Sequence, residues 1–365
     1  MESIRFNHLI KKDHESGLFF VYWPWGFCFQ DSDLYFCSMS VITHEMSLEN
    51  FQEQLEYVLN HYHNHGKSAS QYSNIVIGGL GGSGIGGRIA RLFFWNEMPI
   101  PVEVYSDYNM PGYANEKTLV ILCSYSGNTE ETLTMYKDAK SRNCDIICMA
   151  AGGELMEIAQ SNGLPFYTIA TGYQPRMTLG FALGNLVMIL GEVLGKDMSG
   201  EIAAVKSMFE NPTTAIQRAK EMHALFQPTI AQKFVVVTDK NFEAVAIRFC
   251  QQIQENAKGE GFISVLPEAN HNMIESYYEK HDTNFIFLNS KQNPRVSARF
   301  EFVKKVLTDM GNVVYDYPLE NASLISQFEV IHATDWLSIW ASDDKKANNM
   351  EVGIIMQLKG HLSNI

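Results

Sequence analysis

The sequence predicts an α/β protein with two doubly wound parallel sheets in tandem. Three observations lead to this fold class. Short apolar runs alternate with amphipathic helical patterns from residue 47 onward, the alternation occurs twice, and a polar, helix-rich stretch at 195–227 separates the two series. Such alternation is typical of parallel sheets that are covered by helices on both faces. A chain of 365 residues has room for about two domains.

The first series accounts for the elements of one sheet. Apolar runs predict strands at 74–77, 101–105, 118–123, 145–150 and 165–169. Helical spacing of apolar residues predicts helices at 48–64, 85–95, 129–142 and 175–194. We therefore expect a first subdomain over residues 39–200.

The second series repeats the pattern. Its predicted strands are 233–238, 262–266, 284–288 and 312–315, and its predicted helices are 242–258, 295–310 and 324–340. A further apolar-periodic helix at 352–362 follows them. These elements predict a second subdomain over residues 201–365 that ends in this helix.

Residues 1–38 do not continue either pattern, and we interpret them as an extension outside the core. An apolar run at 18–29 follows Lys11 and Lys12, which superficially resembles a signal peptide. Pro24 and Gly26 interrupt the run, however, and no small-residue cleavage site follows it. The run is also shorter than the roughly 20 apolar residues of a membrane-spanning helix.

The amino-acid composition limits the kinds of molecule that this protein can bind. The formal net charge of −13 disfavours nucleic acid and anionic membranes. Six scattered cysteines, most of them in apolar stretches, predict a reducing compartment, and hence a cytoplasmic protein. His61 and His65 have the spacing of metal ligands on a helix, but Gly66 follows directly, so we interpret them as a solvated helix end. No metal or cofactor is expected.

The strongest local signal is the glycine-rich run GGLGGSGIGG at 78–87, between the first strand and a helix. Glycines let the backbone approach a ligand closely, and a helix N-terminus favours negative charge. The run predicts an anion site. Gly79, Gly81 and Gly84 also match a dinucleotide fingerprint, and a tight strand-to-helix turn without a ligand is a third interpretation.

A second loop favours phosphate among these interpretations. The segment SYSGNTEE at 124–131 follows another predicted strand and opens another helix. Hydroxyls and backbone N–H groups at a helix start suit a phosphate dianion. An ordinary helix cap would explain one hydroxyl here, whereas Ser124, Ser126 and Thr129 supply three.

Together with three later segments, these loops resemble the sugar isomerase (SIS) fold, and within it the bifunctional phosphoglucose/phosphomannose isomerases. The matching segments are 78–87, SYSGNTEET at 124–132, GYQPR at 172–176, QENAK at 254–258 and PEANHN at 267–272. The resemblance covers roughly residues 45–365. One departure from the family pattern is Thr238-Asp239, which stands where the family usually has a small Gly-Ser pair. Another is Val352, where a threonine is frequent.

The resemblance implies two SIS subdomains and a metal-independent isomerase that interconverts glucose 6-phosphate, and mannose 6-phosphate, with fructose 6-phosphate through a cis-enediolate. It also implies roles for individual residues. The substrate phosphate would contact Gly82, Ser83, Ser124, Ser126, Gly127 and Thr129. Arg176 would stabilise the enediolate and Glu255 would move the proton. His271 would open the sugar ring from the neighbouring subunit of a homodimer, and Lys359 would be the C-terminal active-site lysine.

Arg176 also stands out without the resemblance, because it follows Pro175 at the predicted start of an apolar helix, where the helix dipole disfavours a cation. Two other classes of protein remain open at this point. A catalytically silent sugar-phosphate sensor would use the same loops without turnover. An NAD-binding oxidoreductase would use the glycine loop alone.

Overall fold

The fold contains two separate parallel β-sheets. The structure is a computed structural model that describes residues 10–12, 19–21 and 42–362. The chain divides into two compact units, Met1–Ser40 and Val41–Ile365. In the first unit, β1 (Ile10–Lys12) pairs antiparallel with β2 (Phe19–Val21). The rest of the predicted extension 1–38 lies outside the described residues, and the predicted subdomain boundaries stay predictions.

The first sheet has five parallel strands in the order β4-β3-β5-β6-β7. Their bounds are β3 (Asn74–Gly78), β4 (Val102–Tyr105), β5 (Thr118–Ser124), β6 (Asp145–Ala150) and β7 (Phe166–Thr168). The central strands β3 and β5 are buried along their whole length. Their nearly continuous apolar sequence follows from this, since both faces of the sheet are covered.

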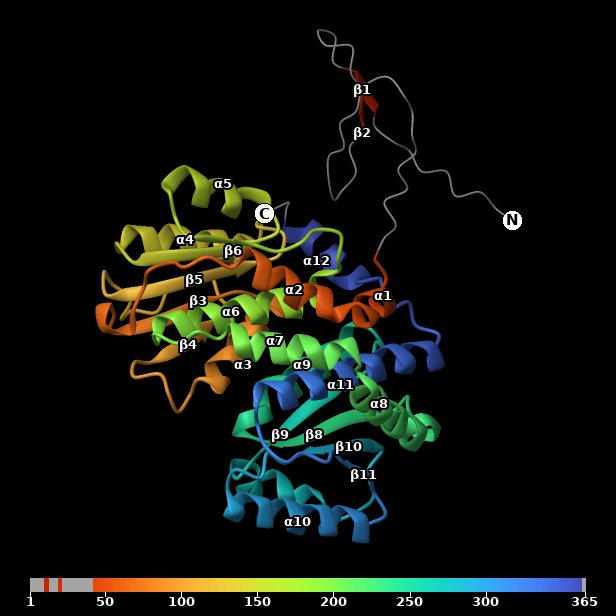
Figure 1. Cartoon of the computed structure of the whole chain (residues 1–365). Coiled ribbons are helices and arrows are strands. Elements are labelled where there is room, and N and C mark those ends of the chain that lie inside the picture. The colour runs from red at the N-terminus through yellow and green to blue at the C-terminus, as the bar shows by residue number, and fades with distance from the viewer. Residues whose placement is uncertain (1–9, 13–18, 22–41, 363–365) are drawn as a thin grey trace. The chain divides into compact units, whose positions relative to one another are not determined.

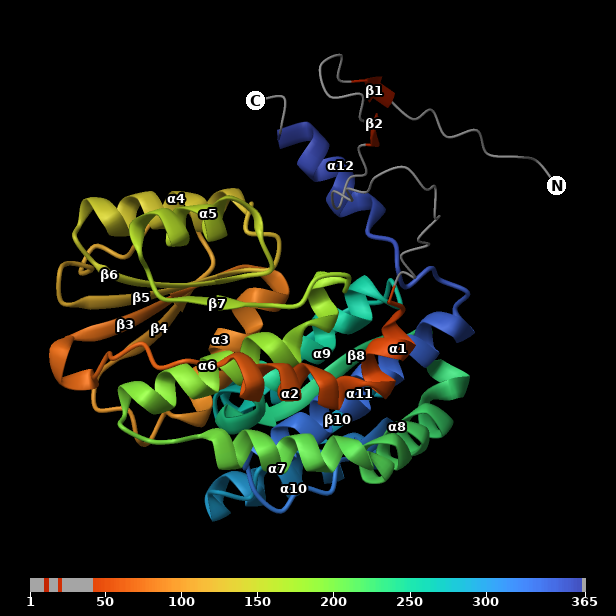
Figure 2. The ribbon, with the colours of Figure 1, turned by 45° about the horizontal axis from the view of Figure 1, so that its top comes forward.

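Helices cover the two faces of this sheet separately. On one face, α4 (Glu130–Ser141) and α5 (Gly153–Asn162) form a core with Val76, Val120 and Ile146 (Figures 1 and 2). On the other face, α2 (Phe51–His61), α3 (Gly81–Phe93) and α6 (Leu179–Val193) pack on strand residues of opposite parity such as Ile75 and Ile121. This alternation of side chains across the strands produces the doubly wound arrangement.

The second sheet has four parallel strands in the order β11-β10-β8-β9. Their bounds are β8 (Lys233–Asp239), β9 (Gly261–Leu266), β10 (Thr283–Leu288) and β11 (Val313–Asp316). On one face, α10 (Pro294–Asp309) packs on Val235 and Phe287. On the other face lie α8 (Thr213–Phe226), α9 (Glu243–Glu255) and α11 (Leu324–Asp344).

A helical layer between the two sheets joins them into one core. The inner faces of both sheets and helices α2, α3, α6, α8, α9 and α11 belong to a single hydrophobic cluster. The remaining described elements are α1 (His44–Glu49), α7 (Ser199–Glu210), α12 (Gly353–Leu362) and the short 3₁₀ turns η1 (Ala69–Gln71), η2 (Pro175–Met177), η3 (Gln227–Thr229), η4 (Lys240–Phe242), η5 (Glu268–His271) and η6 (Met273–Ser276). The predicted fold class is confirmed, and every strand predicted beyond residue 38 is present with ends within one residue.

Several helical predictions need correction. The predicted helix 48–64 is broken at Asn50 into α1 and α2, and it ends at His61. Helix α5 was not predicted, because its sequence opens on Gly152-Gly153 and resembles a loop. The prediction of a solvated helix end at His61 and His65 is wrong for His65, whose side chain is buried against Glu192.

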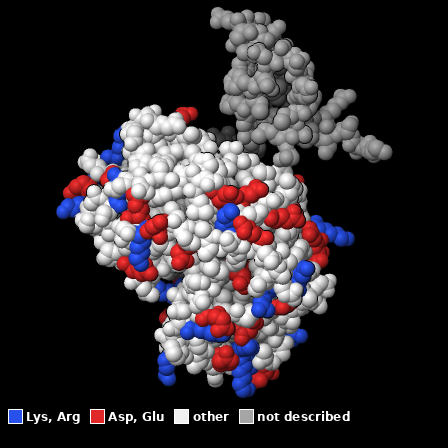
Figure 3. Space-filling model, viewed as in Figure 1, with Lys and Arg blue, Asp and Glu red and all other residues white. Residues whose placement is uncertain are grey.

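The described residues contain no helix that is long and apolar enough to cross a membrane. On the face shown in Figure 3, acidic and basic side chains are interspersed, with no continuous basic stripe. In α12, all side chains are at least partly exposed, including those of Ile354, Met356 and Leu358. This helix therefore presents apolar surface that the described residues do not cover.

Candidate functional site

The glycine-rich loop leads directly into the first turn of α3. This helix begins at Gly81, four residues before the predicted start, so Gly82 and Ser83 lie in its first turn. A Cβ atom on Gly82 would lie only 2.9 Å from the carbonyl oxygen of Pro175. The glycine therefore brings the start of α3 into contact with the turn that carries Arg176, and the first N–H groups of a helix have no intrahelical acceptor.

The hydroxyl-bearing loop follows the neighbouring strand β5. Ser124 is buried, and its Oγ lies 2.9 Å from Oγ1 of Thr129 and accepts the N–H of Gly127 at 3.1 Å. The Oγ of Ser126 accepts the N–H of Asn128 at 3.2 Å. Thr129 is the N-cap residue of α4, but its side chain makes no cap hydrogen bond. The ordinary capping interpretation therefore does not account for this hydroxyl.

Gly127 is required by the shape of this loop. Its φ of +69° lies in the left-handed region, and a Cβ atom there would lie 1.8 Å from the carbonyl oxygen of Gly152. Any side chain would push the loop away from the start of α5. Because β3 and β5 are adjacent parallel strands, both loops lie at the same carboxyl edge of the first sheet.

Arg176 lies in the 3₁₀ turn η2, one short turn before α6, rather than in the first turn of the long helix as predicted. The residue is 5% exposed. Its Nε donates to Oδ1 of Asn256 at 2.8 Å, and its Nη1 lies 3.5 Å from Oε2 of Glu255. Its Nη2 donates to the carbonyl oxygen of Asn349. The structure thus brings Arg176 and Glu255 together, although 79 residues separate them.

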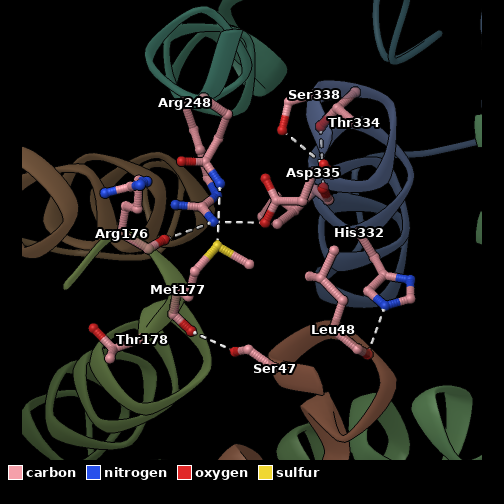
Figure 4. A network of polar contacts seen from close by, with 12 residues as sticks. Ser47, Leu48, Arg176, Met177, Thr178, Arg248, His332, Thr334, Asp335 and Ser338 are labelled. Carbon is pink, nitrogen blue, oxygen red and sulfur yellow. Dashed lines mark hydrogen bonds and ion pairs between the residues drawn. The ribbon is translucent and has the colours of Figure 1, made fainter. Parts of the chain in front are cut away.

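A buried ion pair between α9 and α11 supports this turn (Figure 4). The Nη2 of Arg248, on α9, donates to Oδ2 of Asp335, on α11, at 2.6 Å, and also to the carbonyl oxygen of Arg176 at 3.1 Å. Ser338, one turn along α11, accepts from Nδ2 of Asn256 at 2.9 Å. Both the backbone and the guanidinium of Arg176 are therefore held by α9 and α11.

Helix α1 holds the other side of the turn. Ser47 Oγ donates to the carbonyl oxygen of Met177 at 3.2 Å, which Gln54 Nε2 also reaches at 2.8 Å (Figure 4 shows the contact of Ser47). His44, at the start of α1, is fully buried, and neither ring nitrogen has a hydrogen-bond partner among the described residues. The residues that position Arg176 thus come from three different parts of the sequence.

Burial and positive charge dominate the electrostatics. Burial lowers the pKa of Arg176, and the nearby Glu255 opposes this shift. Burial and the charge of Arg176 also lower the pKa of Lys258, whose ammonium donates to the carbonyl oxygens of Glu255 and Glu351. Burial, together with the charges of Arg176 and Lys258, lowers the pKa of His44 to about 3. Two cations, Arg176 and Lys258, therefore lie close to the carboxylate of Glu255, and this cationic cluster suits an anionic ligand or intermediate.

Two predicted site residues are not brought to this cluster within one chain. His271, at the end of η5, is exposed and contacts none of the other predicted site residues by a hydrogen bond or ion pair in the described part of the chain. Lys359 is exposed on α12 and likewise has no such contact with them. Among the described residues, no group of three His, Cys, Asp or Glu side chains could hold a metal ion.

The sequence analysis missed several residues of this site. Asn256, Arg248 and Asp335 were not singled out, although polar residues inside predicted core helices are a usable signal. His44 was missed because it precedes the predicted start of the first helix. Nothing in the local sequence indicates that α9 and α11 would meet at Arg176.

Fold and site together define a class of protein. Residues 69–171 match a family model described as SIS domain, and residues 215–362 match one described as bacterial phospho-glucose isomerase C-terminal SIS domain. A solved structure described as glucosamine-6-phosphate deaminase from Thermotoga maritima superposes with a TM-score of 0.64 at 14% identity, covering 84% of this chain and 96% of that one. The protein is a SIS-domain protein.

Curated relatives narrow the class to a family. Proteins named bifunctional phosphoglucose/phosphomannose isomerase from Caldicellulosiruptor bescii and Aquifex aeolicus are each 31% identical, over 310 and 321 residues. The alignments cover 81% and 86% of this chain, and 91% and 97% of the relatives. This chain belongs to the bifunctional phosphoglucose/phosphomannose isomerase family.

The loop geometry predicts that Gly127→Ala displaces the loop at 124–129 from the start of α5. Gly66 is the matched control, because its φ of +71° is nearly the same but a Cβ atom there would meet nothing within 4 Å. Both variants lose about 1 to 2 kcal/mol from the left-handed backbone, and only Gly127→Ala adds a clash with Gly152. In urea titrations, Gly127→Ala should therefore lower the free energy of unfolding more than Gly66→Ala does. Equal effects of the two substitutions would contradict the assigned geometry.

The lowered pKa of His44 predicts an acid-sensitive stability. Below pH 6.5 the unfolded chain binds a proton at this residue that the folded chain does not bind until about pH 3, so stability falls as the pH drops. His44→Leu removes this contribution. Between pH 7 and pH 5, the variant should lose about 2 kcal/mol less unfolding free energy than the wild type in urea titrations. His61→Leu, at an exposed histidine, should not show this difference.

Proposed function

We propose that this protein is a metal-independent aldose–ketose isomerase that interconverts glucose 6-phosphate, and mannose 6-phosphate, with fructose 6-phosphate. The observation that carries the proposal is the contact between Arg176 and Glu255, at 3.5 Å, beside the start of α3. A carboxylate next to a buried cation supplies a base and a stabiliser for the anion that the base creates. Membership of the family supports the same reaction.

In the proposed mechanism, Glu255 removes the proton from C2 of the open-chain aldose. The electron pair of the broken C–H bond moves into a cis-enediolate, whose negative oxygen is stabilised by Arg176. Glu255 then returns the proton to C1, and a proton transfer between O1 and O2 completes the ketose. Because Arg176 is held by Asn256 and is 5% exposed, its charge acts where little water screens it.

The two loops at the edge of the first sheet would hold the phosphate. Ser83, Ser126 and Thr129 supply hydroxyls, Ser124 positions the loop through Thr129, and Gly82 and Gly127 keep the backbone close. Charge-assisted hydrogen bonds of this kind suit a phosphate dianion. The remote phosphate would thereby fix the sugar so that its C1 and C2 lie beside Glu255 and Arg176.

Ring opening would require groups beyond this cluster. We assign it to His271, donated by the partner subunit of a homodimer, with Lys359 at the same site. Within the described residues of its own chain, His271 makes no hydrogen bond or ion pair with another proposed catalytic residue, so a second subunit would complete the site. The exposed apolar side chains of α12, such as Ile354 and Leu358, are also consistent with burial in a dimer. A substrate of this kind would place the enzyme in the cytoplasm.

The rival functions explain fewer of these features. An NAD-binding oxidoreductase would leave the cluster of Ser124, Ser126 and Thr129 without a role. A silent sensor would need the phosphate loops but not a base beside Arg176. A coupled assay with fructose 6-phosphate and a chelator, which measures glucose 6-phosphate and mannose 6-phosphate separately, decides among them. Formation of both products also shows that Val352 admits mannose, whereas binding without turnover would favour the sensor.

The proposed base predicts the effect of Glu255→Gln. This variant keeps the shape of the side chain but cannot accept the proton, so isomerisation should fall by at least about 10² to 10⁴-fold. Sugar-phosphate binding should persist, because the loops are intact. Glu243→Gln, at the other end of α9, is the control and should retain activity. Near-normal turnover by Glu255→Gln would refute this mechanism.

Donation of His271 across a dimer predicts complementation between two inactive variants. In a mixed dimer of Glu255→Gln and His271→Ala chains, one of the two sites combines the intact Glu255 of one chain with the intact His271 of the other. Random reassembly should therefore restore about one quarter of the wild-type activity. If His271 acts within its own chain, both sites of the mixed dimer are defective, and the mixture stays inactive.

A further inference from the structure

A cavity at the carboxyl edge of the second sheet is not used by the proposed reaction. Its volume is about 270 Å³, and it lies between the end of α3, the loops after β8 and β10, and the start of α11. Five carboxamides line it, from Asn96, Asn241, Gln292, Asn321 and Gln327, with the ring of Phe93 on one wall. No charged side chain of the described residues lines this cavity.

The cavity stands in the same topological place as the phosphate loops of the first subdomain. Strand β8 pairs with β9 and β10 just as β3 pairs with β4 and β5. The register pairs Gly78 with Leu122 and Thr238 with Leu288. By this correspondence, Gly79 matches Asp239 and Ser124 matches Ser290. Ligands of open parallel sheets bind at such an edge, between the loops of adjacent strands.

In the second subdomain, the carboxylate of Asp239 occupies the place between the two loops that a bound anion would take. One carboxylate oxygen of Asp239 accepts the N–H of Asn241 at 2.9 Å, and the other accepts the N–H of Ser290 at 2.8 Å. Asp239 is 6% exposed. A phosphate would have to displace this carboxylate and then lie beside it without a cation from the cavity wall. The second edge therefore excludes the phosphorylated substrate.

An unsatisfied acceptor points to a ligand that can donate hydrogen bonds. Gln327 is 2% exposed, and its Nε2 donates to the carbonyl oxygen of Ala322 at 3.2 Å. Its Oε1 has no partner among the described residues. This buried acceptor is not in contact with solvent, and its lack of a partner is costly. Gln327 lies in the cavity wall, so a rotation of its side chain toward the cavity would let a ligand hydroxyl satisfy Oε1.

We propose that this cavity is a second small-molecule site, which binds a neutral polyhydroxylated compound, an unphosphorylated sugar or polyol. Carboxamides both donate and accept hydrogen bonds, and hydroxyl groups do the same, so the lining matches such a ligand without any charge. Phe93 offers an apolar surface to the C–H face of the ligand. The site is distinct from the cluster around Arg176 and Glu255, and only the blocking of the first site in its test rests on the function proposed above.

The test uses the full chain with its substrate site saturated by an equilibrated mixture of glucose 6-phosphate and fructose 6-phosphate. D-sorbitol, D-glucose and inorganic phosphate are then each titrated by calorimetry into this saturated protein, in which the loops of the first sheet are already occupied. We expect saturable binding of one polyol per chain and no binding of phosphate. Linear heats for both polyols, or saturable binding of phosphate, would overturn the proposal.

Variants locate the binding. Gln327→Met, which keeps the length of the side chain, should weaken polyol binding about tenfold, whereas Gln217→Met on α8, outside the cavity, should not. Because Gln327 is buried, the double variant Asn96→Ala/Gln292→Ala provides a second test at exposed residues whose side chains make no hydrogen bond among the described residues. Unchanged polyol affinity in the double variant, with normal unfolding, would show that the cavity is not the site.

Discussion

The buried guanidinium of Arg176 is the constraint on which the rest of the structure depends. A cation at 5% exposure is costly unless nearly all of its donors are satisfied. Here the partners come from the second subdomain through Asn256 and Glu255, and from the chain beyond α11 through the carbonyl of Asn349. The first subdomain supplies the arginine but none of these partners. The site therefore exists only when the two subdomains are packed together.

The packing of helices α9 and α11 against each other meets this requirement. Helix α11 is buried over most of its length, so apolar contacts alone would define its position along the core only weakly. Two polar contacts fix α11 against α9. Asp335 pairs with Arg248, and Ser338, one turn further along α11, accepts a hydrogen bond from Asn256. Since Arg248 also binds the carbonyl oxygen of Arg176, any sliding of one helix against the other would displace the guanidinium.

The sequence predicted the parts of the molecule that depend on local pattern. Every strand of the two parallel sheets was found, because most of them are short apolar runs, and the run at 118–124 is buried along its whole length. The loops at 78–87 and 124–131 were found because their glycines and hydroxyls are unusual in composition. Helix α5 and the break at Asn50 were not, since a Gly-Gly start and one unfavourable residue are weak signals. The contact between Arg176 and Glu255 depends on the packing of α3, α9 and η2, which no local pattern encodes.

The two sheets share one topology, but their carboxyl edges differ in chemistry. Helices α3 and α9 follow the corresponding strands β3 and β8 of the two sheets, and they contact each other in the shared helical layer. After β3, glycines let the helix start lie close to the turn of Arg176, and the adjacent loop carries the hydroxyls of Ser124, Ser126 and Thr129. After β8, the side chain of Asp239 takes the N–H groups of both adjacent loops. With its own anion position filled, the second subdomain contributes to the first site through the opposite end of α9, where Glu255 and Asn256 meet Arg176.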